Sequence, residues 1–292
     1  MAIRALHFKS DATVLHHGLR LVRAGFPCNR PARIPGKPPQ TTRNAAMIDQ
    51  EIEIPTRDGH TTTFISHPER DGPHPVILFY MDAPGIREEL RDMARRLATS
   101  GYYVVLPNMY YRAHVMEIGP IPPEEDAPER KRMAELMFSL NIPLVMQDTR
   151  ALLDFIATQP AASKGPIGCL GYCMSGQYAI NAAAAFPDRV AAAASIYGTH
   201  LMTEKPDSPH KVARNAKAEL YFACAEFDRW APLEMIEPLR SALNADSVQA
   251  EVELCPGVHH GFAFPKRPVY NKGAAERHWE RLLALYRRRL QS

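Results

Sequence analysis

Three residues whose side chains can together perform nucleophilic catalysis follow one another along the chain: Cys173, Asp228 and His260. A thiol is mostly protonated at neutral pH, so it needs a neighbouring base to become the nucleophilic thiolate. In such a set the histidine takes the proton and later gives it to the leaving group, while the aspartate holds the imidazole tautomer. Because a thiolate also leaves readily from a thioester, the set predicts hydrolysis of an activated ester or lactone rather than of an amide.

The sequence around Cys173 predicts a sharp turn between a strand and a helix. An apolar run ends at Tyr172, and an alanine-rich helical segment follows the turn. This is the arrangement of a nucleophile elbow, where the side chain of the nucleophile points away from the sheet. Gly171, Ser175 and Gly176 supply the small residues that the close approach of strand and helix requires. The usual elbow has a serine nucleophile and has glycine at the position of Ser175. Because the match here is looser, a buried structural cysteine at a strand end would fit the pattern as well.

The candidate acid and base each follow a predicted strand. Asp228 comes after the strand 219–224, at the edge of a parallel sheet where sites form. Alone, Asp228 could equally cap the helix that follows it. His260 lies in a short loop after the strand 250–255, where a general base is expected, although a surface histidine pair with His259 is the alternative. The order nucleophile, acid, base favours the catalytic interpretation of all three residues.

The same elements predict where the negative charge of a tetrahedral intermediate would be held. The backbone N–H of Met174 directly follows Cys173 and is one candidate oxyanion donor. The second candidate is the backbone N–H of Ala83, in the loop after the apolar run 76–81. His259 and His260 are adjacent and lack the spacing of metal ligands, so we expect neither a metal nor another cofactor.

Strand-like and helix-like segments alternate along the chain. Residues 51–55 and 61–67 alternate polar and apolar side chains, as in an antiparallel hairpin at a sheet edge. Residues 109–128 and 198–216 are expected to be loops. This alternation predicts an α/β-hydrolase fold, with a mostly parallel central sheet flanked by helices on both faces. Further strands are expected at 76–81, 102–106, the run up to Tyr172, 190–197, 219–224 and 250–255, and helices at 86–99, 129–140, 144–158, 232–244 and 274–290.

Charge is distributed unevenly along the 292 residues. Residues 1–46 contain eight Lys and Arg and one acidic residue, and subtracting this +7 from the net charge of +3 leaves −4 for 47–292. A mildly acidic folded part argues against nucleic acid as a partner. No apolar run reaches the ~18 residues of a membrane span, so no membrane partner is expected.

The basic segment 1–46, rich in Arg and Pro, lacks a helical or strand period and is expected to be disordered. It is either a targeting segment or an extension that precedes a natural start at Met47. We expect 47–292 to form the α/β-hydrolase domain and to fold alone. The five cysteines are odd in number and have no metal-type spacing, which favours a reduced, cytoplasmic setting.

With these motifs in place, the sequence resembles the dienelactone hydrolase family, thiol-dependent enzymes that open lactone or enol-ester rings. The similar segments are 82–88, 101–102, 107–110, 171–176, 226–228 and 260–262, and the resemblance covers about 47–290. It implies that Cys173 is the nucleophile, Asp228 the acid and His260 the base. It favours His260 over His259, because the histidine of the family precedes a small residue and then phenylalanine.

Two positions depart from the pattern of that family. Asp82 stands where the family has a glutamate that helps gate thiolate formation. Phe264 stands where the family has an arginine that holds the substrate carboxylate, with Lys266 and Arg267 close by. Arg112, Arg130 and Arg132 are further candidates for binding an anion, or else are solvated side chains of a helix face. Tyr110, Tyr111 and Trp230 either line the substrate pocket or pack in the core.

The sequence therefore predicts a hydrolase whose partner is a small-molecule ester or lactone. A carboxylesterase or thioesterase without dienelactone activity is the alternative that the missing arginine supports. A non-catalytic binding protein of the same fold is a third possibility, against which the intact order of Cys173, Asp228 and His260 argues. No feature of the sequence indicates an oligomeric state.

Overall fold

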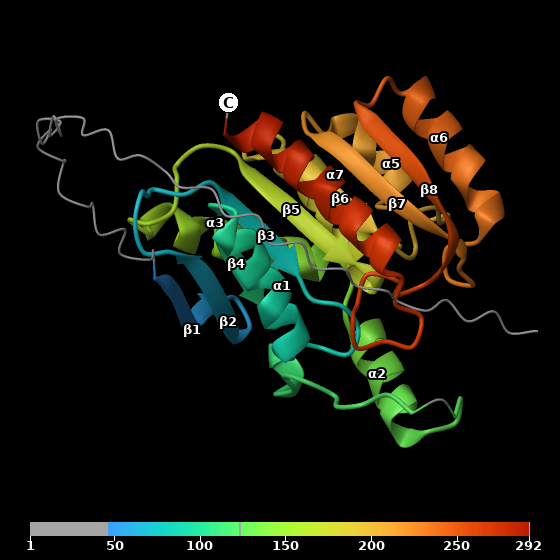
Figure 1. Cartoon of the computed structure of the whole chain (residues 1–292), viewed down its shortest axis with the longest axis horizontal. Coiled ribbons are helices and arrows are strands. Elements are labelled where there is room, and N and C mark those ends of the chain that lie inside the picture. The colour runs from blue at the N-terminus through green and yellow to red at the C-terminus, as the bar shows by residue number, and fades with distance from the viewer. Residues whose placement is uncertain (1–45, 123, 292) are drawn as a thin grey trace, which may run out of the picture. The chain divides into compact units, whose positions relative to one another are not determined.

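The computed structural model describes residues 46–122 and 124–291, so the predicted extension at 1–46 lies almost entirely outside the described part. At its centre is an eight-stranded sheet in the order β1-β2-β4-β3-β5-β6-β7-β8 (Figure 1). Its strands are β1 (Met47–Thr56), β2 (Gly59–Pro68), β3 (Val76–Tyr80), β4 (Tyr103–Pro107), β5 (Ile167–Tyr172), β6 (Val190–Ile196), β7 (Glu219–Phe227) and β8 (Ala250–His259).

The sheet is mostly parallel, as the sequence predicts. Only β1 with β2 and β2 with β4 are antiparallel pairs, and these form the predicted hairpin edge. The other neighbours, from β4 to β8, are parallel. All five residues of β3 are buried, which explains its continuous apolar run: a central parallel strand has both faces covered.

Helices cover both faces of the sheet. In Figure 1 α1 and α7 lie on the face toward the viewer, and α3 lies behind the sheet and contacts α4. The apolar residues of α1 recur at helical spacing, so Leu90, Ala94 and Leu97 are fully buried against the sheet. The helices are α1 (Glu88–Thr99), α2 (Pro128–Ser139), α3 (Ile142–Thr158), α4 (Gly176–Ala185), α5 (Pro209–Val212), α6 (Ile236–Ala245) and α7 (Lys272–Leu290).

Two strands extend further than their apolar runs predict. The runs end at 224 and 255, but β7 continues to Phe227 and β8 to His259, and these two residues pair after a register shift. Backbone hydrogen bonds hold these partly exposed ends, so apolar patterning does not reveal them. The extension places Asp228 and His260 directly after paired strand ends. The predicted loop 198–216 also contains the short helix α5, which Pro209 begins.

The turn between β5 and α4 is so tightly packed that two of its positions leave no room for a side chain. A Cβ atom on Gly171 would lie 2.0 Å from the carbonyl oxygen of Ser175, and one on Gly176 would lie 2.5 Å from the Cα of Gly198. Cys173 itself has φ +54, in the left-handed region that non-glycine residues rarely adopt. The strand–turn–helix geometry of a nucleophile elbow is therefore present, and glycine is required on both sides of it.

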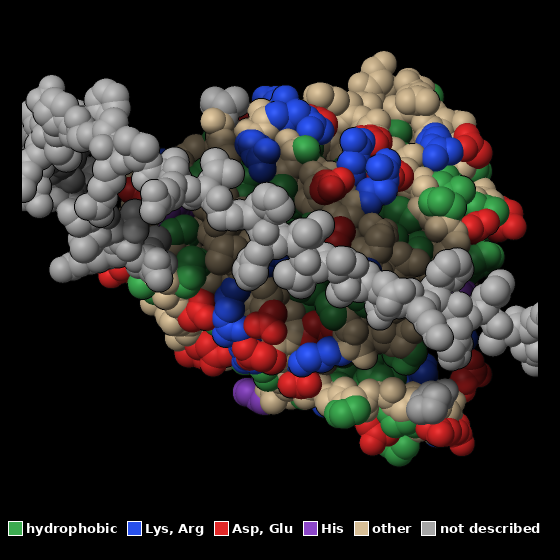
Figure 2. Space-filling model, in the orientation of Figure 1, with side chains coloured by type: hydrophobic (Ala, Val, Ile, Leu, Met, Phe, Trp, Pro, Cys, Tyr) green, Lys and Arg blue, Asp and Glu red, His purple; other side chains and the backbone are tan. Residues whose placement is uncertain are grey.

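Acidic and basic side chains are intermixed over α1 and α7 on the face shown in Figure 2. On this surface Arg95 pairs with Asp49 at 2.6 Å, and Arg91 pairs with Glu51 at 2.6 Å. Such exposed pairs each contribute about 0–1 kcal/mol to stability. Among residues 46–122 and 124–291, no helix combines the length and the apolar character that crossing a membrane requires.

The packing at Gly171 generates a stability prediction. We expect Gly171→Ala to lower the free energy of unfolding by about 3 kcal/mol, because its Cβ meets backbone that cannot move without opening the elbow. Gly165→Ala is the matched control, since the nearest atom to its Cβ is the Ser163 hydroxyl at an ordinary 3.4 Å. Urea unfolding of both variants measures the difference, and equal stabilities would contradict the packing argument.

Candidate active site

Cys173 lies at the carboxyl end of β5, where the strand ends and a 3₁₀ turn (Cys173–Ser175) leads into α4. Its thiol is partly exposed, whereas the other cysteines of the described chain, Cys169, Cys224 and Cys255, are buried. The N–H of Thr199 donates to its carbonyl at 3.0 Å, which helps to hold the strained backbone. Of the described thiols, Cys173 is thus the one that a substrate could reach.

Asp228 and His260 are brought together by the ends of β7 and β8. Nδ1 of His260 lies 2.7 Å from Oδ2 of Asp228, whose side chain is fully buried. The other carboxylate oxygen accepts the backbone N–H groups of Trp230 at 2.8 Å and Ala231 at 3.1 Å. Asp228 therefore holds both the turn that follows β7 and the histidine, one oxygen for each role. It does not cap a helix, because α6 begins only at Ile236.

His260 lies next to Cys173 and is protonated more readily than an ordinary histidine. Burial lowers the pKa of His260, but the charge of Cys173 and hydrogen bonds to Asp228 and Cys173 raise it more, so that the pKa rises from 6.5 to about 10. The ring of Tyr197 packs edge-on against the imidazole, with ring centroids 4.9 Å apart. These contacts fix the imidazole between a thiol and a carboxylate, which is the geometry of a general base.

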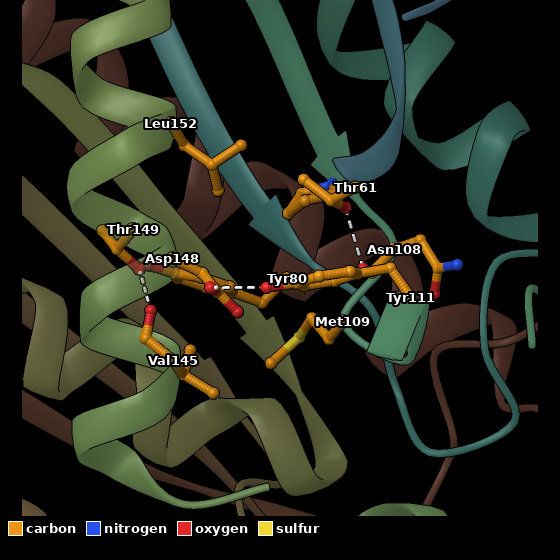
Figure 3. Close-up of a pocket in the computed structure, with 10 residues that line it drawn as sticks. Thr61, Tyr80, Asn108, Met109, Tyr111, Val145, Asp148, Thr149 and Leu152 are labelled. Atoms are coloured by element: carbon orange, nitrogen blue, oxygen red, sulfur yellow. Dashed lines mark hydrogen bonds between the residues drawn. The ribbon is translucent and has the colours of Figure 1, made fainter. Parts of the chain in front are cut away.

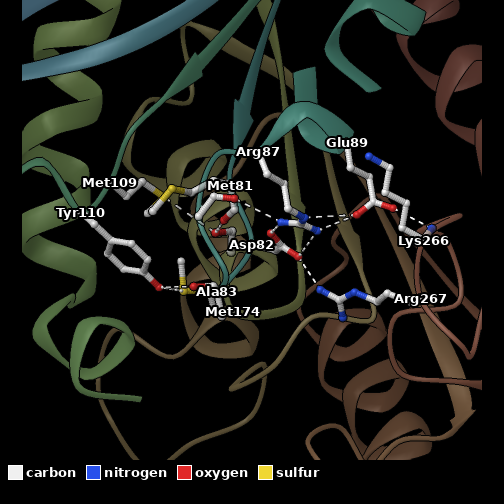
Figure 4. A network of polar contacts seen from close by, with 12 residues as sticks. Met81, Asp82, Ala83, Arg87, Glu89, Met109, Tyr110, Met174, Lys266 and Arg267 are labelled. Atoms are coloured by element: carbon white, nitrogen blue, oxygen red, sulfur yellow. Dashed lines mark hydrogen bonds and ion pairs between the residues drawn. The ribbon is translucent and has the colours of Figure 1, made fainter. Parts of the chain in front are cut away.

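Ala83 and Met174, the two predicted oxyanion residues, meet at one tyrosine. The Tyr110 hydroxyl donates to the carbonyl of Ala83 at 2.9 Å and lies 3.4 Å from Sδ of Met174 (Figure 4). Within the described part of the chain, the backbone N–H groups of Ala83 and Met174 donate to no backbone or side-chain acceptor. Two donors without protein acceptors thus flank the carboxyl ends of β3 and β5.

Asp82, the predicted counterpart of a gating acid, forms ion pairs with arginine side chains through both of its carboxylate oxygens. Its side chain is completely buried, and its two oxygens lie 2.6 Å from Nη1 of Arg87 and 2.6 Å from Nη2 of Arg267. Arg87 also pairs with Glu89 at 3.0 Å, and Glu89 accepts the N–H of Lys266 at 2.9 Å. Figure 4 shows these side chains converging from three segments of the chain. Asp82 therefore anchors the loop that carries Ala83.

Phe264 belongs to the core rather than to an open pocket. Its side chain is fully buried and packs edge-on against Tyr172 with ring centroids 5.4 Å apart. The guanidinium groups of Arg87 and Arg267 lie 5.0 Å and 4.7 Å from its ring centroid. Both cations that pair with Asp82 are thus stacked on Phe264, so this ring supports the arginines instead of lining a pocket beside Cys173.

Tyr111 and Arg112 belong to another cluster. Arg112 forms hydrogen-bonded ion pairs with Asp148 at 2.7 Å and with Asp58 at 2.8 Å, and the Tyr111 hydroxyl donates to Asp148 at 3.0 Å. Tyr111 and Asp148 line a cavity of about 10 Å³ with Tyr80 (Figure 3). That volume accommodates about one water molecule and no ester. In the structure both residues are engaged in this cluster through hydrogen bonds to Asp148.

The remaining pocket candidates differ in position. Trp230 is about half exposed beside Asp228, and the guanidinium of Arg229 lies 4.8 Å from its ring centroid. Arg130 donates to the carbonyl of Pro122 at 2.7 Å, and Arg132 pairs with Glu135 on the surface of α2. No cluster of three His, Cys, Asp or Glu side chains suited to a metal ion occurs in residues 46–122 and 124–291.

The partners of Asp82 were not predicted from the sequence. Arg87 follows Asp82 by five residues, and its position at the start of a helix with Glu89 two residues later was the available signal. Arg267 lies 185 residues away in the chain, and only the fold brings its guanidinium to Asp82. Tyr197 was predicted to end a strand, but its contact with His260 was not predicted.

Comparisons with known proteins identify the family of the chain. A model of the dienelactone hydrolase family matches residues 61–290. The protein named "Putative carboxymethylenebutenolidase" of Yersinia pestis is 30% identical over 243 residues, which are 80% of this chain and 85% of that protein. A protein of the same name from Escherichia coli strain K12 is 28% identical over 254 residues, with 84% and 89% covered. The crystal structure of a "Putative Dienelactone Hydrolase" from Klebsiella pneumoniae is 26% identical, has a TM-score of 0.72, and is matched over 82% of this chain and 98% of that one.

The contact between His260 and Cys173 generates a titration prediction. In the Cys173→Ala protein we expect the pKa of His260 to fall well below about 10, because the charge that raises it is removed while burial still lowers it. NMR titration of the histidine side chains measures this value. His278 is the internal control, since burial lowers its pKa to about 3 and it should stay neutral in both proteins.

The sign of the pH effect on stability follows from the same shift. A pKa raised in the folded state means that the protonated His260 stabilises the fold fully below pH 6.5, and that this stabilisation is lost as the pH rises through about 10. An unchanged His260 pKa in the Cys173→Ala protein would show that the thiol and the imidazole do not interact.

Proposed function

The chain belongs to the dienelactone hydrolase family, and we propose that it hydrolyses small lactones or activated esters with Cys173 as nucleophile, His260 as base and Asp228 as acid. The observation that carries this proposal is the position of a strained, accessible cysteine beside a histidine that is bound to a buried carboxylate at 2.7 Å. Non-glycine residues with a positive φ have a strained backbone, and such residues cluster at functional sites.

In the first half of the proposed reaction, the proton of the Cys173 thiol has passed to His260, whose raised pKa favours the imidazolium, and the thiolate attacks the carbonyl carbon of the ester. The oxygen of that carbonyl becomes negative and is held by the backbone N–H groups of Ala83 and Met174. The intermediate then collapses to a thioester on Cys173 and expels the alkoxide or enolate, which takes the proton from His260.

In the second half, a water molecule attacks the thioester and gives its proton to His260. Collapse of the second intermediate releases the carboxylic acid and the Cys173 thiolate, which the protonated His260 stabilises. With a lactone the leaving oxygen is tethered to the acyl group, so the product is one open chain. Asp228 keeps Nδ1 of His260 as a donor throughout, so Nε2 is the nitrogen that exchanges protons.

A carboxylesterase or thioesterase without dienelactone activity is the second candidate, and one observation favours it. The guanidinium of Arg267, the arginine nearest in sequence to Phe264, is already paired with Asp82 at 2.6 Å. A substrate carboxylate would have to compete with that buried aspartate, whereas an uncharged ester would not.

A reduced, cytoplasmic setting stays a prediction from the cysteine content.

The proposal predicts that hydrolysis depends on one thiol. We expect Cys173→Ala to lower kcat/KM for an aryl acetate, a dienelactone or both by about 10³-fold or more, because the covalent route is lost. Cys255→Ala is the matched control, since it removes a buried thiol of β8. Turnover of the aryl acetate alone would favour the esterase. Turnover that persists in Cys173→Ala would contradict the proposed nucleophile.

A further inference from the structure

Tyr110 is the residue whose side chain contacts both proposed oxyanion residues. Its ring is buried, and its hydroxyl donates to the Ala83 carbonyl at 2.9 Å and lies 3.4 Å from Sδ of Met174. Ala83 follows β3 and Met174 follows β5, so one hydroxyl bridges the two strand ends from which the proposed donors come (Figure 4). A hydroxyl has a single proton, and the carbonyl of Ala83 is the stronger acceptor for it.

Tyr110 is itself held in place by the loop after β4. Its backbone N–H donates to Oδ1 of Asn108 at 2.9 Å, and Nδ2 of Asn108 donates to the carbonyl of Val115 at 2.9 Å. The carbonyl of Asn108 accepts the hydroxyl of Thr61 from β2 at 2.8 Å. The phenol is therefore fixed to the scaffold before it reaches Ala83, which a positioning group requires.

Ala83 is constrained from its other side as well. The preceding residue, Asp82, is held by Arg87 and Arg267, and the Tyr110 hydroxyl binds the carbonyl that follows the Ala83 N–H along the backbone. The peptide groups on both sides of Ala83 are thus anchored, while its N–H has no acceptor in the described part of the chain. An N–H held in this way stays directed at one point in space.

We propose that Tyr110 is a positioning residue for the hydrolysis, whose hydroxyl holds the Ala83 N–H and the Met174 N–H convergent on the developing oxyanion. This inference rests on the proposed function. Oxyanion donors act only when they are fixed before the reaction, and the loss of one donor costs about 10²–10³ in kcat. Loosening one donor costs less than removing it. Desolvation raises the pKa of Tyr110, so its hydroxyl stays protonated and serves as a donor over the working pH range.

The test is Tyr110→Phe, which removes the hydroxyl and keeps the ring. We expect kcat for an aryl acetate to fall about tenfold with KM within about twofold, because the donors are needed in the transition state. Alkylation of Cys173 by iodoacetamide forms no oxyanion, so its rate and pH profile should match those of the wild type. Tyr111→Phe is the control: it removes the neighbouring hydroxyl, which binds Asp148 and Thr56 in the separate cluster.

Each other outcome is informative. Unchanged kcat in Tyr110→Phe would overturn the proposal, and so would an equal loss of kcat and of the alkylation rate, since Tyr110 would then act on the thiol. If Tyr110→Phe does not fold, Asn108→Ser, which loosens Tyr110, carries the same test with the same readouts. Wild-type turnover that does not need Cys173 would instead refute the proposed function, which separates that failure from a failure of the Tyr110 proposal.

Discussion

The close approach of β5 and α4 at Gly171 and Gly176 is the constraint on which the rest of the site depends. It forces φ of Cys173 to +54 and so directs the thiol out of the sheet. The turn is also tied to the neighbouring strand, because the buried hydroxyl of Ser175 donates to the carbonyl of Met81. Since Met81 directly precedes Asp82 and Ala83, the elbow and the proposed oxyanion loop form one connected unit. A serine in place of the usual elbow glycine thereby supplies a hydrogen bond that glycine could not.

The two buried carboxylates have different roles because their partners differ. Asp228 shares its oxygens between two backbone N–H groups and an imidazole that can change its charge, which suits the proposed role in proton transfer. Asp82 faces two guanidinium groups that stay charged at any accessible pH, so it can only hold structure. Removing one partner from a buried ion pair typically costs about 3–5 kcal/mol, because the remaining charge is left uncompensated. This rigidity is useful beside a donor such as Ala83, whose contribution depends on its fixed direction.

The sequence was sufficient to predict the fold and the family, and it placed Asp228 and His260 after strands whose ends the structure brings together, because strand-end positions and small residues at a turn are local signals. It was insufficient wherever a side chain finds its partner across the fold. Phe264 was expected near the substrate, yet it packs under Arg87 and Arg267, since a ring four residues after His260 in sequence turns inward with the loop. Arg112 was a candidate anion binder, yet Asp58 and Asp148 already neutralise it. Neither pairing has a spacing that periodicity could reveal.

The central claim is that catalysis passes through a thioester on Cys173, and trapping that thioester tests it most directly. The enzyme is mixed with an excess of 4-nitrophenyl acetate, quenched in acid within the first turnover, and digested for peptide mass spectrometry. We expect one added acetyl group, located on the peptide of the β5–α4 turn and assigned to Cys173 by fragmentation. An acetyl group on Ser175 or elsewhere, or an unmodified peptide during active turnover, would contradict it.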